Sequence, residues 1–137
     1  MELRSGRHVV FMLHAHLVFT TKRRGKVLTR DHLARLEAIF RDVCADFEVE
    51  LREFNGESDH VHLLVNYPPK CRLSELVNSL KGVSSRRLKQ EFPSIKAFWS
   101  VKKSRGVLWT PSYFAGSVGG APLSVLRQYI EQQQRPS

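Results

Sequence analysis

The spacing of apolar residues changes repeatedly along this chain, and this change restricts the folds open to it. Residues 33–47 place apolar side chains every three or four positions, which is the pattern of one helix face. Residues 47–52 and 60–67 instead alternate between apolar and polar side chains, which is typical of half-buried strands. Because both patterns occur in alternation, the sequence predicts an α+β domain.

Seven segments follow in the order strand, helix, strand, strand, helix, strand, helix. The first strand is expected over 8–20, and Thr29 is a suitable cap for the first helix. A turn is expected at Asn55-Gly56, a second helix from Ser74, and short strands over 108–118. The β-α-β-β-α-β core predicts a ferredoxin-like or RRM-like antiparallel sheet with helices on one face, plus a C-terminal helix after the Gly119-Gly120 joint.

Length and composition favour one domain over residues 1–137. The chain has 137 residues, of which 42% are hydrophobic, and we expect a core over about 8–118 and a mobile helix over about 121–135. Apolar runs stay well below the roughly 18 residues of a membrane span, so no membrane is expected. His14 and His16 interrupt an N-terminus that faintly resembles a secretion signal, which favours a cytoplasmic protein. The spacing of Cys44 and Cys71 indicates neither a metal site nor a disulfide framework, and Cys44 is expected in the core.

The charge balance points to a polyanionic partner. The chain carries 22 Lys and Arg against 13 Asp and Glu, a net charge of +9. In a small domain this excess most often indicates nucleic acid, although solubility alone is the simpler alternative. The candidate DNA-binding residues lie in a basic turn and on the polar face of the second helix: Lys22, Arg23, Arg24, Lys81, Arg86, Arg87 and Lys89.

The strand around residue 60 carries a His-x-His pair. Residues two apart in a strand point to the same face, so His60 and His62 lie side by side, opposite the face of Val61, Leu63 and Val65. Adjacent imidazoles form half of a divalent-metal site and need a third ligand from elsewhere. The alternative is a pair of structural or surface histidines.

The last helix carries a candidate nucleophile. Tyr129 and Gln133 are four residues apart and share one helix face. A tyrosine hydroxyl can attack a phosphodiester to form a covalent phosphotyrosine, and the Gln133 amide oxygen can act as the missing ligand. Tyr67 and Tyr113 are alternative nucleophiles, although both also fit packing roles. A tyrosine at a helix interface is the simplest interpretation of Tyr129 taken alone.

Taken together, these residues resemble a known family. The chain is similar to the small single-tyrosine transposases of bacterial insertion sequences, within the HUH (His-hydrophobic-His) nuclease superfamily. Five segments carry the resemblance in order, and they are HLVFTTKRR at 16–24, DHVHLL at 59–64, LKGVSSRR at 80–87, LWTPSYF at 108–114, and VGGAPL at 118–123 leading to YIEQQ at 129–133.

The resemblance implies a role for each site residue. His60, His62 and Gln133 match the metal ligands, with Mg²⁺ or Mn²⁺ as the ion, and Tyr129 matches the nucleophile. It also implies a homodimer, in which the tyrosine helix of one subunit can complete the other subunit's site. The substrate implied is single-stranded DNA with hairpins near the element ends. No nucleotide cofactor is expected, because the phosphotyrosine bond conserves the energy of the cleaved phosphodiester bond.

One departure and three alternatives accompany the resemblance. Arg23 stands where the family often has an aromatic residue, which affects DNA contact and leaves the catalytic set intact. A related branch acting at dispersed palindromic repeats shares the same chemistry. A relaxase or replication initiator is usually larger than this chain. A non-catalytic RRM-like module would need aromatic residues on the open sheet face, where this chain has histidines.

Overall fold

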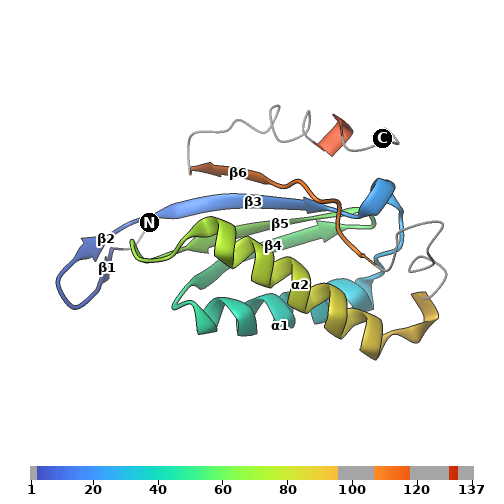
Figure 1. Cartoon of the computed structure of the whole chain (residues 1–137), viewed down its shortest axis with the longest axis horizontal. Coiled ribbons are helices and arrows are strands. Elements are labelled where there is room, and N and C mark those ends of the chain that lie inside the picture. Colours follow the sequence, from blue (N-terminus) through green and yellow to red (C-terminus); the bar gives the residue numbers. More distant parts are fainter. Residues whose placement is uncertain (1–2, 96–106, 118–129, 133–137) are drawn as a thin grey trace.

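A computed structural model describes residues 3–95, 107–117 and 130–132. Its main feature is a four-stranded antiparallel sheet in the order β4-β5-β3-β6. The strands are β3 (His14–Thr20), β4 (Glu50–Glu57), β5 (His60–Asn66) and β6 (Phe114–Ser117), with helices α1 (Arg30–Asp46) and α2 (Leu73–Glu91) between them in the chain. Both helices cover the same face of the sheet (Figure 1). The predicted α+β class with an antiparallel sheet is therefore confirmed.

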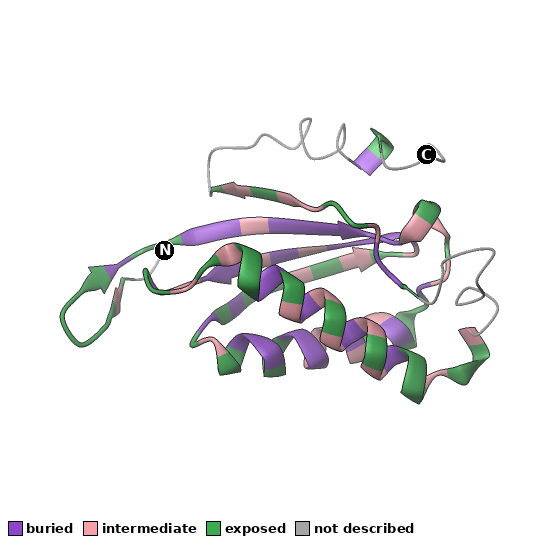
Figure 2. Ribbon diagram, viewed as in Figure 1, coloured by how far each residue is buried: buried purple, intermediate pink, exposed green. Residues whose placement is uncertain are grey.

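The core lies between the helices and the sheet. Leu17, Phe19 and Leu63 point toward the helices and are at most 1% exposed. Figure 2 shows buried residues alternating with exposed ones along both helices. Phe19, Phe40 and Trp109 meet edge-on or tilted at ring-centroid distances of 5.9–6.4 Å. Cys44 is buried as predicted, and its burial raises the thiol pKa to about 12. Among the described residues, no helix is long and apolar enough to cross a membrane.

The helix boundaries follow local sequence signals closely. Thr29 caps α1 as predicted, because its hydroxyl accepts a bond from the His32 backbone N–H, and the Thr29 backbone N–H in turn donates to His32 Nδ1. Glu48, with φ of 58°, follows the end of α1 and turns the chain toward β4. The predicted start of the second helix at Ser74 was one residue late, because Arg72 occupies the N-cap and the helix begins at Leu73.

The prediction of one strand over 8–20 was wrong in part. Strands β1 (Arg4–Ser5) and β2 (Val10–Phe11) pair with each other, and residues 12–13 separate β2 from β3. This small hairpin projects away from the main sheet (Figure 1). Its side chains include several exposed apolar residues, so an apolar run alone did not indicate where the main sheet begins.

The predicted turn at Asn55-Gly56 was also wrong. Both residues lie inside β4, and the β4–β5 hairpin turns at Ser58 and Asp59. A Cβ atom on Gly56 would lie 2.5 Å from Leu33 Cδ2 and 3.2 Å from Val61 Cγ1. The glycine therefore permits a close approach of α1 to the sheet and does not form the turn.

Candidate metal and nuclease site

The β3–β5 register places the two predicted histidines on the sheet face that α1 and α2 leave open. His60 pairs with Thr20, and His62 pairs with Val18. The two imidazole centroids are 5.3 Å apart. Val61 and Leu63 alternate with the histidines and are buried under the helices, as the sequence predicted.

Asp59 orients the His60 ring. Its Oδ1 lies 2.8 Å from His60 Nδ1, and its Oδ2 accepts a bond of 2.6 Å from Arg24 Nε. Burial opposes ionisation of Asp59, yet these bonds and the charges of Arg24 and His60 hold its pKa below the ordinary value. Because both carboxylate oxygens are engaged, Asp59 acts as an orienting group and leaves His60 Nε2 free to bind a ligand.

Glu57 brings a carboxylate to the free side of His60. It is the cross-strand partner of His60, and its Oε2 lies 3.7 Å from His60 Nε2. Potential ligand atoms of Glu57, Asp59 and His60 lie within 4.8 Å of one another. Because Arg24 and His60 already engage the Asp59 oxygens, Glu57 is the carboxylate of this group that is placed to bind an ion. Sequence reasoning did not single out Glu57, although its exposed position on the open face follows from the alternation of β4.

His62 is half-buried, and its lowered pKa favours the neutral form of the imidazole. Burial, together with the neighbouring His60 and His16, lowers its pKa, and Glu57 only partly opposes this. The imidazole is therefore neutral at physiological pH, which is the form that binds metals. His62 is not part of the group formed by Glu57, Asp59 and His60, and its ring centroid lies 5.3 Å from that of His60. Imidazole nitrogens and carboxylate oxygens are donor types that suit Mn²⁺ and related divalent ions.

Residues 130–132 lie on this same open face. Residues 130–132 are helical, and Ile130, which is 7% exposed, packs against Val18 and Phe114. In Figure 1 this segment lies on the side of the sheet opposite α1 and α2. Because Val18 pairs with His62, the segment docks one cross-strand step from the histidines. Tyr129 and Gln133, which flank the segment in the chain, lie outside the described residues.

Comparison with known proteins decides the family. The family described as "Transposase IS200 like" matches residues 9–133. The chain belongs to the IS200-like transposase family. It is 34% identical over 134 residues to the ISDra2 transposase TnpA of Deinococcus radiodurans, covering 97% of this chain and 92% of that protein. It is 28% identical over 130 residues to the transposase for insertion sequence element IS200 of Salmonella typhimurium, covering 95% and 82%.

Solved structures agree with the sequence comparison. A crystal structure of a Deinococcus radiodurans R1 protein superposes with a TM-score of 0.83 at 33% identity, covering 97% of this chain and 99% of that one. A REP-associated tyrosine transposase bound to a REP hairpin shares the fold, with a TM-score of 0.57 at 12% identity over 93% and 68% of the two chains. Family membership makes this chain a DNA-processing enzyme, as the resemblance implied.

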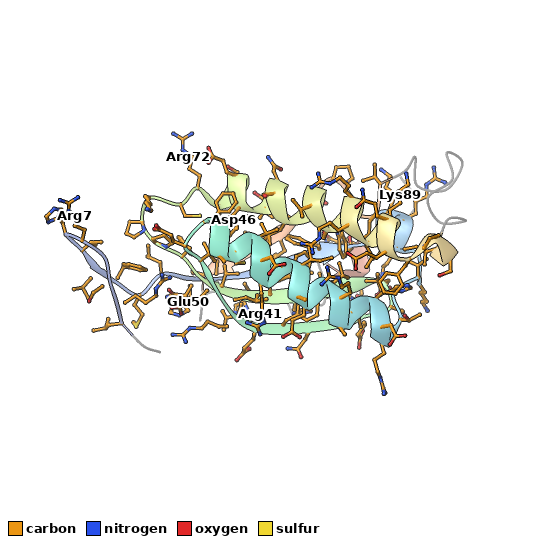
Figure 3. The ribbon with its side chains drawn as sticks, turned by 90° about the horizontal axis from the view of Figure 1, so that it is seen from below. Arg7, Arg41, Asp46, Glu50, Arg72 and Lys89 are labelled. Atoms are coloured by element: carbon orange, nitrogen blue, oxygen red, sulfur yellow. The ribbon has the colours of Figure 1, made fainter. Side chains whose placement is uncertain are left out.

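Several predicted DNA-binding residues of this transposase line one groove beside α2. Lys22, Lys81, Arg86 and Lys89 line a cavity of about 560 Å³ together with Trp109 and residues 110–111. Figure 3 shows Lys89 at the end of α2 distant from Arg72. The groove therefore gathers four basic side chains from two separate predicted clusters.

Not every predicted basic residue faces that groove freely. Lys81 Nζ donates to the carbonyls of Thr110, Pro111 and Ser112 at 2.6, 3.0 and 3.2 Å. Burial lowers the pKa of this ammonium to about 8. Arg87 lies 3.4 Å from Asp42, and Arg24 is bound to Asp59. The DNA-binding roles of all seven predicted basic residues remain predictions.

Proposed function

We propose that this transposase cuts and rejoins single-stranded DNA at insertion-sequence ends through a covalent 5′-phosphotyrosine intermediate. The observation that carries the proposal is the pair His60 and His62 on the same open sheet face where the segment containing Ile130 docks. The strand order β4-β5-β3-β6 supports the ferredoxin-like arrangement of the sheet. A C-terminal helix that carries Tyr129 is part of the same proposal. We also propose that residues 1–137 form one domain, because the described helices pack on a single four-stranded sheet.

The metal set of this proposal is His60, His62 and Gln133, with Mg²⁺ or Mn²⁺ as the ion. Glu57 offers an additional carboxylate oxygen beside His60 Nε2. The Thr20 hydroxyl, the cross-strand neighbour of His60, is buried and has no hydrogen-bond partner among the described residues. A phosphate oxygen or an ordered water at the site would satisfy it. When bound, the ion would offset the charge of the scissile phosphate.

In this proposal, Tyr129 performs the covalent step. The Tyr129 oxygen attacks the phosphorus, the bond from phosphorus to the 3′ oxygen breaks, and the departing strand leaves with a 3′ hydroxyl. Attack by another strand's 3′ hydroxyl reverses the step and releases the tyrosine. Because one phosphodiester-type bond replaces another at each stage, the reaction needs no nucleotide hydrolysis.

Binding rests on the basic side chains and on assembly. The groove lined by Lys22, Arg86 and Lys89 fits a phosphate backbone, since such contacts are independent of base sequence. We propose hairpins of single-stranded DNA as the ligand and a homodimer as the working assembly. Sedimentation of the purified protein with and without a hairpin oligonucleotide tests both.

The deciding experiment detects the covalent adduct. Single-stranded DNA carrying the element ends is labelled at its 3′ end in one sample and at its 5′ end in another. With Mn²⁺, only the 3′-labelled fragment should migrate with the protein on a denaturing gel, and EDTA should abolish the band. Tyr129→Phe should form no adduct while it still binds the hairpin. An adduct with the 5′-labelled fragment, or full activity of Tyr129→Phe, contradicts the mechanism.

A further inference from the structure

The guanidinium of Arg24 joins two segments that are far apart in the chain. Its Nε donates to Asp59 Oδ2 at 2.6 Å, and its Nη1 donates to the Ile130 carbonyl at 3.1 Å. The Arg24 side chain is only 14% exposed. Since Asp59 also binds His60 Nδ1 at 2.8 Å, a continuous chain of hydrogen bonds runs from Ile130 to His60.

The backbone that aims Arg24 is held in an uncommon conformation. Arg23 and Arg24 have φ values of 54° and 53°, in the left-handed region that side chains disfavour. Two bonds from Thr21 fix this turn, from its N–H to the Asp59 carbonyl at 2.9 Å and from its Oγ1 to the Gly25 carbonyl at 2.7 Å. The fold therefore holds the backbone of Arg23 and Arg24 in a strained conformation. This conformation places the Arg24 side chain against Asp59.

We propose that Arg24 is a positioning residue, which latches the segment containing Ile130 onto the open face and links its docking to the orientation of His60. One rigid guanidinium binds both Asp59 and the Ile130 carbonyl. Loss of one of these two hydrogen bonds therefore weakens the hold of Arg24 on the other partner. The inference rests on the proposed function in one respect. Tyr129 precedes Ile130 in the chain, so a latch on Ile130 restricts where the nucleophile can reach.

Hydrogen exchange measures the latch directly. The full chain is studied without metal or DNA, and exchange is followed by mass spectrometry in the peptide that contains residues 130–132. Arg24→Met should speed exchange there about tenfold or more, because a charge-assisted bond is lost. Arg23→Met is the matched control, since it removes the same charge from a neighbouring residue with the same backbone conformation, and it should change exchange less than about twofold.

A conservative variant separates the two bonds. Arg24→Lys keeps the positive charge beside Asp59, but its single ammonium cannot bridge both acceptors. We expect exchange at residues 130–132 to rise as in Arg24→Met, while Mn²⁺ affinity, measured by calorimetry, stays within about threefold of wild type. In Arg24→Met the Mn²⁺ affinity should fall about tenfold or more, because Asp59 no longer holds His60 in place. Arg24→Lys also guards against misfolding, since Asp59 stays paired.

Unchanged exchange at residues 130–132 in both Arg24 variants would overturn the latch. Faster exchange of equal size in α1 would also overturn it, because the effect would then be general loss of stability. The outcomes are separable from the proposed function, since exchange needs neither DNA nor cleavage. An inactive wild type with Arg24-dependent exchange would refute only the transposase mechanism.

Discussion

The two faces of the sheet contrast sharply although the same strands form both. On the helix-covered face, Leu17, Phe19 and Leu63 are buried under α1 and α2. On the open face, His60 and His62 lie beside Glu57 and Asp59, and the docked segment meets Val18. In β5 these roles alternate residue by residue. Under the proposed function, neighbouring positions therefore serve stability and chemistry separately, and single substitutions can test one without the other.

The largest expected effect comes from the open face. His62→Ala should reduce Mn²⁺-dependent adduct formation about 1,000-fold or more, because the site loses a metal ligand, while the free energy of unfolding changes by less than about 1 kcal/mol. His60→Ala should show the same loss of activity and also lower stability by about 1–3 kcal/mol, since Asp59 loses a partner. A gel assay and urea unfolding measure the two quantities. His8→Ala, an exposed histidine outside the sheet, is the control. Retained cleavage would make these histidines structural.

One residue further along β5, the opposite outcome is expected. Leu63→Ala should lower the free energy of unfolding by about 2–5 kcal/mol, because a cavity opens under the helices. Adduct formation at low temperature, where the variant is folded, should stay within a few-fold of wild type. Leu64→Ala provides a half-buried leucine on the open face for comparison. If Leu63→Ala and Leu64→Ala destabilise equally, the contrast between the faces fails.

A smaller effect is expected from the carboxylate beside His60. Glu57→Gln should weaken Mn²⁺ binding about threefold to tenfold, because an amide oxygen is a poorer ligand for a hard cation than a carboxylate. Glu53→Gln makes the same charge change on the same strand and should leave the affinity unchanged. Calorimetry with the metal alone gives both values. Equal weakening in the two variants would indicate a general charge effect.

The smallest effect concerns the groove beside α2. Arg86→Ala should weaken hairpin binding a few-fold and reduce the salt dependence of the binding constant by about one unit of slope, without loss of stability. Lys81→Met should instead destabilise the fold, because the three carbonyls that Lys81 binds lose their donor. Fluorescence anisotropy at several salt concentrations and thermal unfolding distinguish the two variants. A salt slope unchanged by Arg86→Ala would remove this arginine from the DNA interface.

The lysine also adds a pH dependence with a definite sign. Burial lowers the pKa of Lys81 to about 8, so the unfolded chain binds more protons than the folded chain above that pH. The contribution of Lys81 to the free energy of unfolding therefore rises as the pH increases from about 8 toward the pKa of this lysine in the unfolded chain. The same contribution falls as the pH drops through 8. Comparing unfolding of wild type and Lys81→Met at pH 7 and pH 10 isolates this contribution.

Strand alternation predicted the faces correctly because it is a purely local property. His60, His62 and the opposite Val61 were assigned from spacing alone. The roles of Gly56 and Arg24 were not predicted, since Gly56 accommodates Leu33 of α1 and Arg24 meets Asp59, which is 35 residues away. Such contacts exist only after the chain has folded. Tyr129 and Gln133 lie outside the described residues, and their roles stay predictions.

The irregular edge of the sheet has a consequence for how molecules meet in solution. Strand β4 is an outermost strand, and its register shifts between Leu51 and Glu53. Exposed charges follow it at Glu50, Arg52, Glu53 and Glu57. A strand from another molecule would have to pair across this bulge and bury those charges, both of which disfavour edge-to-edge association. At high concentration, this edge is therefore protected from the amyloid-like stacking to which a flat apolar strand is prone.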